Sequence, residues 1–109
     1  MRLRPTSISI ALAAASLLAA AGSATAQDVA ALRLKALAAT CANCHGTQGR
    51  AIDGAAVPGL AGMPAPYIVE QLKAFKAGSR PATVMQQLAK GYSESQIEHV
   101  AAYFAAQKK

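Results

Sequence analysis

The feature that most constrains this chain is a pair of cysteines followed directly by a histidine, in the run Cys41-Ala42-Asn43-Cys44-His45. Cysteines three positions apart lie about one helical turn from each other, so both thiols and the following imidazole project from one short segment. Such a segment can hold one flat ligand from one side. The rest of a small chain must then fold around the ligand's other face.

The spacing C-x-x-C-H is the attachment signature of c-type haem. Each thiol can add to one haem vinyl group, and the next residue brings an imidazole to the iron. We therefore expect one covalent haem c, attached through Cys41 and Cys44 and ligated by His45.

Two other uses of these cysteines are possible from residue type. A Cys41–Cys44 disulfide of the thioredoxin kind normally accompanies a βαβ pattern, and the sequence has no strand-like alternation. A zinc site would need a fourth ligand, for which only His99 remains, and His45 is poorly placed to share a tetrahedral ion with Cys44. The pattern favours haem over both alternatives.

The N-terminus has the pattern of a secretory signal. Arg2 and Arg4 precede an apolar run over residues 8–21, and Ala24-Thr25-Ala26 matches a signal peptidase site. The apolar run is shorter than the roughly 20 residues that cross a bilayer. We expect residues 1–26 to be a cleaved signal peptide, residues 27–109 to form a single domain without a membrane span, and the protein to be periplasmic.

Apolar residues recur at helical spacing in three segments, which predicts an all-α fold. The first covers residues 29–44, with Asp28 as its N-cap, and the second starts near Pro66 and ends at Gly78. The third follows Ser93, which with Gln96 forms a capping-box pattern. A short segment over residues 81–90 carries Met85.

A loop rich in glycine and proline separates the first two predicted helices. It covers residues 46–63, with turns expected at Asp53-Gly54 and Pro58-Gly59. A loop of this length in a small domain is typically functional or wraps around a bound group.

Several stretches together resemble the small bacterial class I cytochromes c. The sequence is most similar to the single-haem cytochrome subunit of flavocytochrome c sulfide dehydrogenase. The resemblance is carried by Cys41-Ala-Asn-Cys-His-Gly46, Val57-Pro-Gly-Leu-Ala-Gly62, Tyr67 to Phe75, Arg80-Pro-Ala-Thr-Val-Met85 and Ile97 to Ala105. It implies the class I fold, in which three main helices and a short methionine-bearing segment surround one haem.

The resemblance also implies roles for single residues. By residue type, Met63, Met85 and His99 could each supply a second axial ligand, and the resemblance selects Met85. It places the Pro58 carbonyl as the acceptor of a hydrogen bond from the proximal imidazole, and Leu60 against the porphyrin. A shared crossing of the first and last helices would involve Leu37, Ala38, Val100, Tyr103 and Phe104.

A haem with histidine and methionine ligands favours outer-sphere one-electron transfer. No acid, base or nucleophile constellation is visible, so we expect no catalysis by this chain alone. The resemblance implies an electron-accepting subunit bound to a flavoprotein in a heterodimer that oxidises sulfide. The alternatives are a free periplasmic shuttle to an oxidase or reductase, and a haem-based sensor with a weak or absent sixth ligand.

The charge pattern argues against nucleic acid as a partner. The formal net charge is +6, but the basic residues are dispersed and few aromatic residues accompany them. We expect a redox protein to dock instead near the haem edge, on small or apolar residues: Ala42, Asn43, Ala61, Gly62, Met63, Pro64 and Val84.

Overall fold

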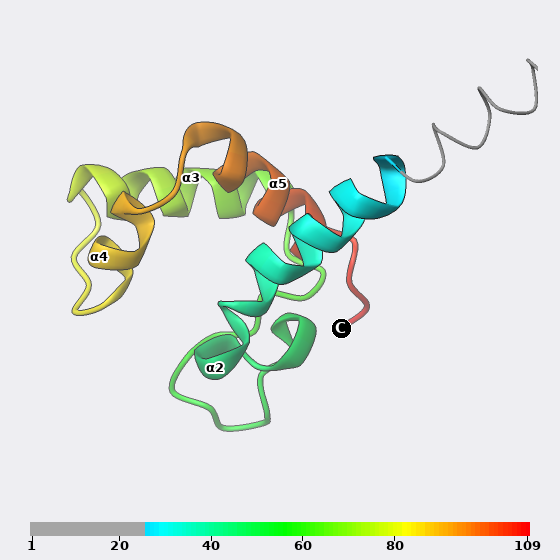
Figure 1. The fold of residues 1–109 in the computed structure, drawn as a ribbon. Coiled ribbons are helices and arrows are strands. Elements are labelled where there is room, and N and C mark those ends of the chain that lie inside the picture. The colour runs from blue at the N-terminus through cyan, green and yellow to red at the C-terminus, as the bar shows by residue number, and fades with distance from the viewer. Residues whose placement is uncertain (1–25) are drawn as a thin grey trace, which may run out of the picture. The chain divides into compact units, whose positions relative to one another are not determined.

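A computed structural model describes residues 26–109, which contain helices, turns and loops but no strand (Figure 1). This confirms the all-α class. The chain divides into two compact units after Arg33. The predicted signal peptide lies outside the described residues except for Ala26. Within the described part, none of the helices has both the length and the apolar character needed to span a bilayer.

The first helix differs from the prediction at both ends. Among the described residues it is helical from 26 to 39, so Asp28 lies inside the helix and is not its N-cap. Thr40 and Cys41 form a turn before α2 (Ala42–His45) begins. Thr40 accounts for this break, since its hydroxyl donates to the Leu37 carbonyl at 2.7 Å and competes for that acceptor with the helix backbone.

The loop after α2 contains a short 3-10 helix, η1 (Thr47–Gly49), which the sequence did not predict. The turn at Asp53-Gly54 is present, but the turn predicted at Pro58-Gly59 is wrong. Residues 58–60 run without a turn, because the Gly49 carbonyl accepts hydrogen bonds from the amides of Leu60 at 2.7 Å and Ala61 at 3.1 Å. The loop is thereby drawn back alongside η1.

The remaining helices are α3 (Ala65–Ala77), α4 (Met85–Lys90) and α5 (Glu94–Ala105). Gly78 ends α3 in the left-handed conformation, with φ +79°, as expected of a C-terminal glycine. The predicted capping box of α5 is confirmed. The Gln96 amide donates to the Ser93 hydroxyl at 3.2 Å, and the Ser93 amide donates to the Gln96 side chain at 2.8 Å.

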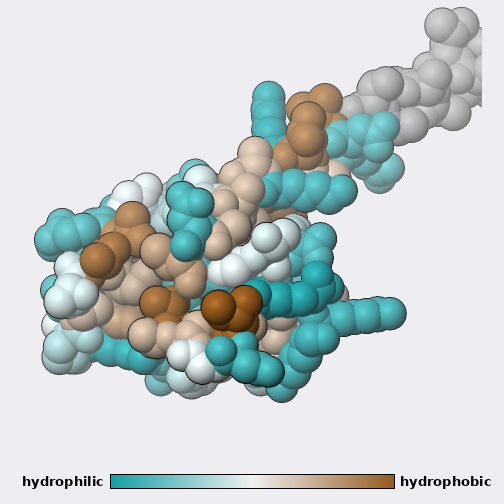
Figure 2. Space-filling model, turned by 90° about the horizontal axis from the view of Figure 1, so that it is seen from below, coloured by the Kyte–Doolittle hydropathy of each residue, from teal (hydrophilic) through white to brown (hydrophobic). Residues whose placement is uncertain are grey.

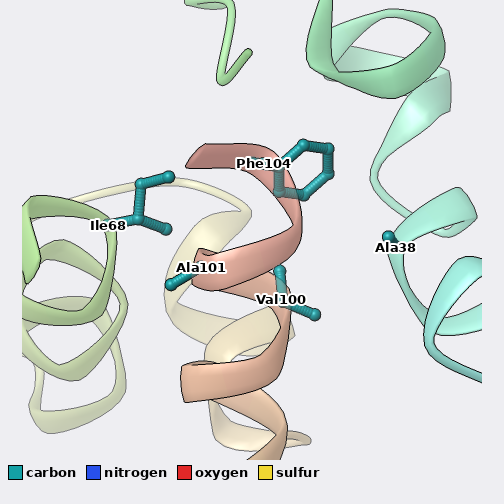
Figure 3. Close-up of a cluster of buried hydrophobic side chains, with 5 residues drawn as sticks. All are labelled: Ala38, Ile68, Val100, Ala101 and Phe104. Carbon is teal, nitrogen blue, oxygen red and sulfur yellow. The ribbon is translucent and has the colours of Figure 1, made fainter. Parts of the chain in front are cut away.

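The core lies along α5, between α3 and the C-terminal part of the first helix (Figure 3). Its buried members come from all three helices: Ala38, Ile68, Val100, Ala101 and Phe104. Leu37 and Tyr103 pack against them, which confirms the predicted crossing of the first and last helices. In the described residues only eight apolar side chains are buried, so the core is small for a stable domain.

Some large apolar side chains stay at the surface. On the face drawn in Figure 2, apolar residues are exposed among hydrophilic ones. In the second unit, exposed fractions of 47–81% are found for Ile52, Tyr67, Val84 and Leu88. Tyr67 lies on α3, and Val84 and Leu88 lie at or on α4, the element that carries Met85.

Candidate haem site

The helix α2 and the turn before it carry the three motif side chains. Cys41 occupies the N-cap position of α2, and its carbonyl accepts hydrogen bonds from the amides of Cys44 at 3.3 Å and His45 at 3.0 Å. Both cysteines are free thiols, Cys41 half-buried and Cys44 exposed. The structure therefore contains no Cys41–Cys44 disulfide, and both sulfur atoms are available for another bond.

His45 is buried, and its ring is held by the loop. The Nδ1 atom lies 2.7 Å from the Pro58 carbonyl oxygen. A carbonyl oxygen can only accept, so Nδ1 carries the donated hydrogen, and Nε2 of a neutral ring then keeps a free lone pair. A histidine that ligates a metal needs this arrangement, in which a hydrogen bond at one nitrogen sets the tautomer for the other. The contact implied by the resemblance is thus present in the structure.

Two glycines allow the loop to return to α2. Gly46 has φ +82°, and a side chain there would overlap the Arg50 carbonyl. Gly49 has φ +78°, and a Cβ atom would lie 2.8 Å from the Phe104 ring and 2.9 Å from the Ala61 amide nitrogen. The tight path through these positions brings Pro58 back beside His45, thirteen residues away in the chain.

The environment of Cys41 affects its ionisation in the haem-free chain. Burial raises the pKa of the Cys41 thiol, and hydrogen bonds from Thr40 and Tyr92 partly offset this effect. The Thr40 hydroxyl lies 3.9 Å from the Cys41 sulfur and 3.1 Å from the Tyr92 hydroxyl. Cys41 sits in the turn after the first helix, beside the connection between α4 and α5.

The three candidates for a second axial ligand differ in their surroundings. Met85 is the first residue of α4 and is half-buried. Met63 packs against the core cluster, and His99 is exposed on α5, where its Nδ1 atom lies 3.5 Å from the Ser95 hydroxyl. Met85 and His45 lie on separate elements, since His45 ends α2 and Met85 begins α4.

Leu60 is half-buried and packs against the core cluster. It follows Pro58 by two residues and is anchored by the hydrogen bond from its amide to the Gly49 carbonyl. Its predicted contact with a porphyrin remains a prediction, as do the haem-binding roles of the other predicted site residues.

The residues present fit a haem c. Two free thiols, a buried imidazole with the required tautomer and a half-buried thioether are the donors that such a group uses. Exposed apolar side chains at Tyr67, Val84 and Leu88 would be stabilised by an apolar ring that covered them. Across residues 26–109 no group of three or more His, Cys, Asp or Glu side chains is placed to hold a metal ion.

The predicted docking surface is smaller than the sequence indicated. Ala61 is only 7% exposed, Met63 packs against the core, and the Lys109 side chain lies over Gly62. These three residues are buried or covered because the loop folds back against the core. Ala42 is half-buried, and Asn43, Pro64 and Val84 are exposed.

Sequence reasoning missed several residues that position the site. The positioning roles of Gly46 and Gly49 could have been predicted, because both glycines lie within four residues after His45. Tyr92 gave no such signal, because its hydroxyl meets Thr40 across 52 residues. Arg80 opens a stretch that carries the resemblance, but its contact with the Phe75 ring, at 4.5 Å from the ring centre, was not predicted.

Comparison with known proteins agrees with this geometry. A model of the cytochrome c family matches residues 31–108. The chain is 43% identical over 68 residues to the cytochrome subunit of sulfide dehydrogenase of Chlorobaculum tepidum, covering 62% of this chain and 60% of that protein. It is 39% identical over 71 residues to the thiosulfate dehydrogenase electron acceptor of Thiomonas intermedia, covering 65% of this chain and 33% of the relative.

Among solved structures, the cytochrome c4 of Acidithiobacillus ferrooxidans is similar, with a TM-score of 0.57 and 39% identity. The match covers 61% of this chain and 37% of that structure. The matched region thus spans between about one third and three fifths of these three proteins. With its class I cytochrome c fold and a family match over most of its length, the chain belongs to the cytochrome c family, whose members transfer electrons through covalently bound haem.

Proposed function

We propose that this chain is the electron-accepting cytochrome of a periplasmic, sulfide-oxidising flavoprotein complex, with a single haem c held by Cys41, Cys44, His45 and Met85. The observation that carries the haem assignment is the hydrogen bond between His45 Nδ1 and the Pro58 carbonyl, at 2.7 Å. It gives the imidazole the tautomer and the fixed orientation that an iron ligand needs.

The chain's own residues bind, orient and shield the cofactor. Cys41 and Cys44 provide the two attachment points, and Met85 provides a soft sulfur donor from a separate helix. When bound, a haem iron with histidine and methionine ligands has both axial positions filled and supplies one-electron transfer rather than oxygen or substrate chemistry. Leu60 and the exposed apolar residues of α3 and α4 would exclude water from the ring.

The partner is proposed from two relatives. One is named a cytochrome subunit of sulfide dehydrogenase and the other an electron acceptor of thiosulfate dehydrogenase. Both names describe an acceptor of electrons from an enzyme that acts on a reduced sulfur compound. The flavoprotein nature of the donor and the periplasmic location come from the resemblance and the predicted signal peptide.

A free periplasmic shuttle is the second candidate. The likeness to a cytochrome c4 favours it, because that protein is described by its electron transfer and is not named as a subunit of an enzyme. The two functions differ in how the partner is held: an apolar subunit contact responds little to salt, whereas a steered encounter between charged surfaces slows strongly as ionic strength rises.

Substitution of each methionine in the haem-loaded protein tests the ligand assignment. Met85→Ala should abolish the weak near-infrared charge-transfer band of methionine-ligated ferric haem and lower the reduction potential. Met63→Ala is the matched control, because Met63 packs in the core, and it should keep the band. Loss of the band in Met63→Ala alone would show that Met63 is the ligand. Rapid carbon monoxide binding in the unaltered protein would favour a sensor instead.

The partner is tested by purification from native periplasm at low and at physiological ionic strength. The proposal predicts that a flavoprotein with sulfide-dependent reductase activity co-purifies with the cytochrome in both conditions. Absence of such a protein, together with a steep decline of the electron-transfer rate with added salt, would establish the free shuttle.

A further inference from the structure

We infer that Arg80 is a positioning residue that fixes the segment entering α4 and thereby sets how firmly Met85 binds the haem iron. The inference rests on the proposed role of Met85 as the sixth ligand. It follows from the contacts of the Arg80 side chain and backbone, which join the end of α3 to the first turn of α4.

The side chain of Arg80 is anchored to α3 at two points. Its guanidinium carbon lies 4.5 Å from the centre of the Phe75 ring, which is the geometry of a cation–π contact. One guanidinium nitrogen donates to the side-chain oxygen of Gln71. Gln71 and Phe75 are four residues apart and so lie on one face of the helix, and the planar guanidinium can meet both at once.

The backbone of Arg80 links this anchor to α4. Its amide donates to the Ala74 carbonyl at 3.2 Å, which satisfies an acceptor in the last turn of α3. Its carbonyl accepts from the Gln86 side chain at 3.3 Å, and Gln86 directly follows Met85. Because Pro81 comes next, Arg80 is restricted to extended conformations, and this limits the direction of its carbonyl.

The helix α4 packs on α3, but its start has no side-chain cap. It has only six residues, and its N-cap residue Val84 makes no side-chain capping hydrogen bond. A helix this short is not stable by itself and depends on tertiary contacts. Ala89, which is fully buried, anchors the far end of α4. The Gln86–Arg80 hydrogen bond therefore acts on the end where Met85 lies.

A purely electrostatic role for Arg80 is the alternative. A positive charge near the haem would change the reduction potential whatever its shape, and lysine could replace arginine in that role. Lysine lacks the planar fork and cannot stack on Phe75 while donating to Gln71. The pair of variants Arg80→Lys and Phe75→Leu therefore separates the two roles, since Arg80→Lys keeps the charge and Phe75→Leu removes only the ring.

The experiment uses the haem-loaded protein and imidazole as a probe that competes with methionine for ferric iron. We expect the apparent imidazole affinity to rise about five- to tenfold in Arg80→Lys and about two- to fivefold in Phe75→Leu, in line with the loss of a cation–π contact and a charged hydrogen bond. The pH at which the near-infrared methionine band disappears should fall in the same order. Lys90→Gln is the control, because Lys90 is an exposed cation on α4 whose side chain makes no hydrogen bond or ion pair within residues 26–109, and it should match the unaltered protein.

An imidazole affinity of Arg80→Lys within twofold of the unaltered protein would overturn the inference, as would equal effects of Arg80→Lys and Lys90→Gln. Arg80 is exposed and Phe75 is half-buried, and both are replaced by long side chains. We therefore expect both variants to fold, and the comparison needs no replacement by alanine. Met85→Ala is measured in parallel. If that variant keeps the methionine band, then the ligand assignment is wrong, and this outcome is distinct from a failure of the Arg80 role.

Discussion

The two sides of the proposed haem site are held in different ways. The attachment region, residues 40–62, is held largely by its backbone and by buried groups: His45 on the Pro58 carbonyl, two amides on the Gly49 carbonyl, and Phe104 against Gly49. The α4 region, residues 78–92, packs on α3 through fully buried Ala89, and its two ends are held by partly exposed side chains, with Arg80 on Phe75 and Lys76 on the Tyr92 carbonyl. The segment that carries Met85 is therefore held by more exposed contacts than His45 is.

This difference indicates a division of tasks. A histidine whose ring is buried and hydrogen-bonded stays in one orientation, so the proposed bond from His45 to iron would vary little. A methionine at the start of an uncapped short helix is held by contacts that single substitutions can weaken gradually. If Met85 is the sixth ligand, as proposed, the strength of its bond would be the adjustable property of the site.

The largest expected effect concerns Phe104, the largest buried side chain of the core, at 1% exposure. Phe104→Ala should lower the free energy of unfolding by about 3–5 kcal/mol, because it leaves a cavity where the core meets the attachment region. Leu88→Ala on α4 should cost less, about 1–2 kcal/mol, because Leu88 is 48% exposed in the chain without haem and only the proposed haem would cover it. Urea denaturation of both haem-loaded variants measures the difference. Equal losses of unfolding free energy would contradict the idea that side chains of α4 are less firmly held than the core at Phe104.

A smaller effect is expected from the loop backbone. Gly49→Ala combines positive φ with a close approach to Phe104 and the Ala61 amide, and we expect about 2–4 kcal/mol of destabilisation. Gly54→Ala is the control, because its φ is +78° but nothing lies within 4 Å of the added Cβ atom, and it should cost only about 1–2 kcal/mol. Urea midpoints give the comparison. If the two variants are equally stable, then Gly49 is not closely packed.

The smallest effect concerns the ion pairs that tie α3 to α5. Glu94 lies 3.1 Å from Lys73 and 3.3 Å from Lys76, and hydrogen bonds from these two lysines lower the pKa of Glu94. A lowered pKa in the folded state means that the stabilisation is present above the ordinary value of 4.5 and is lost as the pH falls below it.

Glu94 is fully exposed, so solvent and salt screen this contribution. Unfolding of the unaltered protein and of Glu94→Gln should therefore differ slightly at pH 6 and converge near pH 3, with a smaller difference at high salt. A difference that grows as the pH falls would have the wrong sign and would refute the assignment.

Much of the chain could be predicted because the relevant interactions are local. The motif Cys41 to His45 lies within five residues, and its chemistry depends on that spacing alone. The left-handed end of α3 at Gly78 and the capping box of Ser93 and Gln96 are likewise decided by residues within one helical turn. The helical periodicity of the first and last helices is also a property of single segments, whereas their crossing at Ala38, Val100 and Phe104 was implied by the resemblance.

Other features were decided only by tertiary structure. The stretch at Pro58-Gly59 has the residue types of a turn, yet hydrogen bonds to Gly49 hold residues 58–60 alongside η1. The burial of Ala61, the contact of Tyr92 with Thr40 across 52 residues and the stacking of Arg80 on Phe75 follow from the way the helices pack. The amino-acid sequence alone indicated that Cys41, Cys44 and His45 can bind a haem, because this motif lies within five neighbouring residues. How firmly each group is held depends on contacts between distant segments, which exist only once the chain has folded.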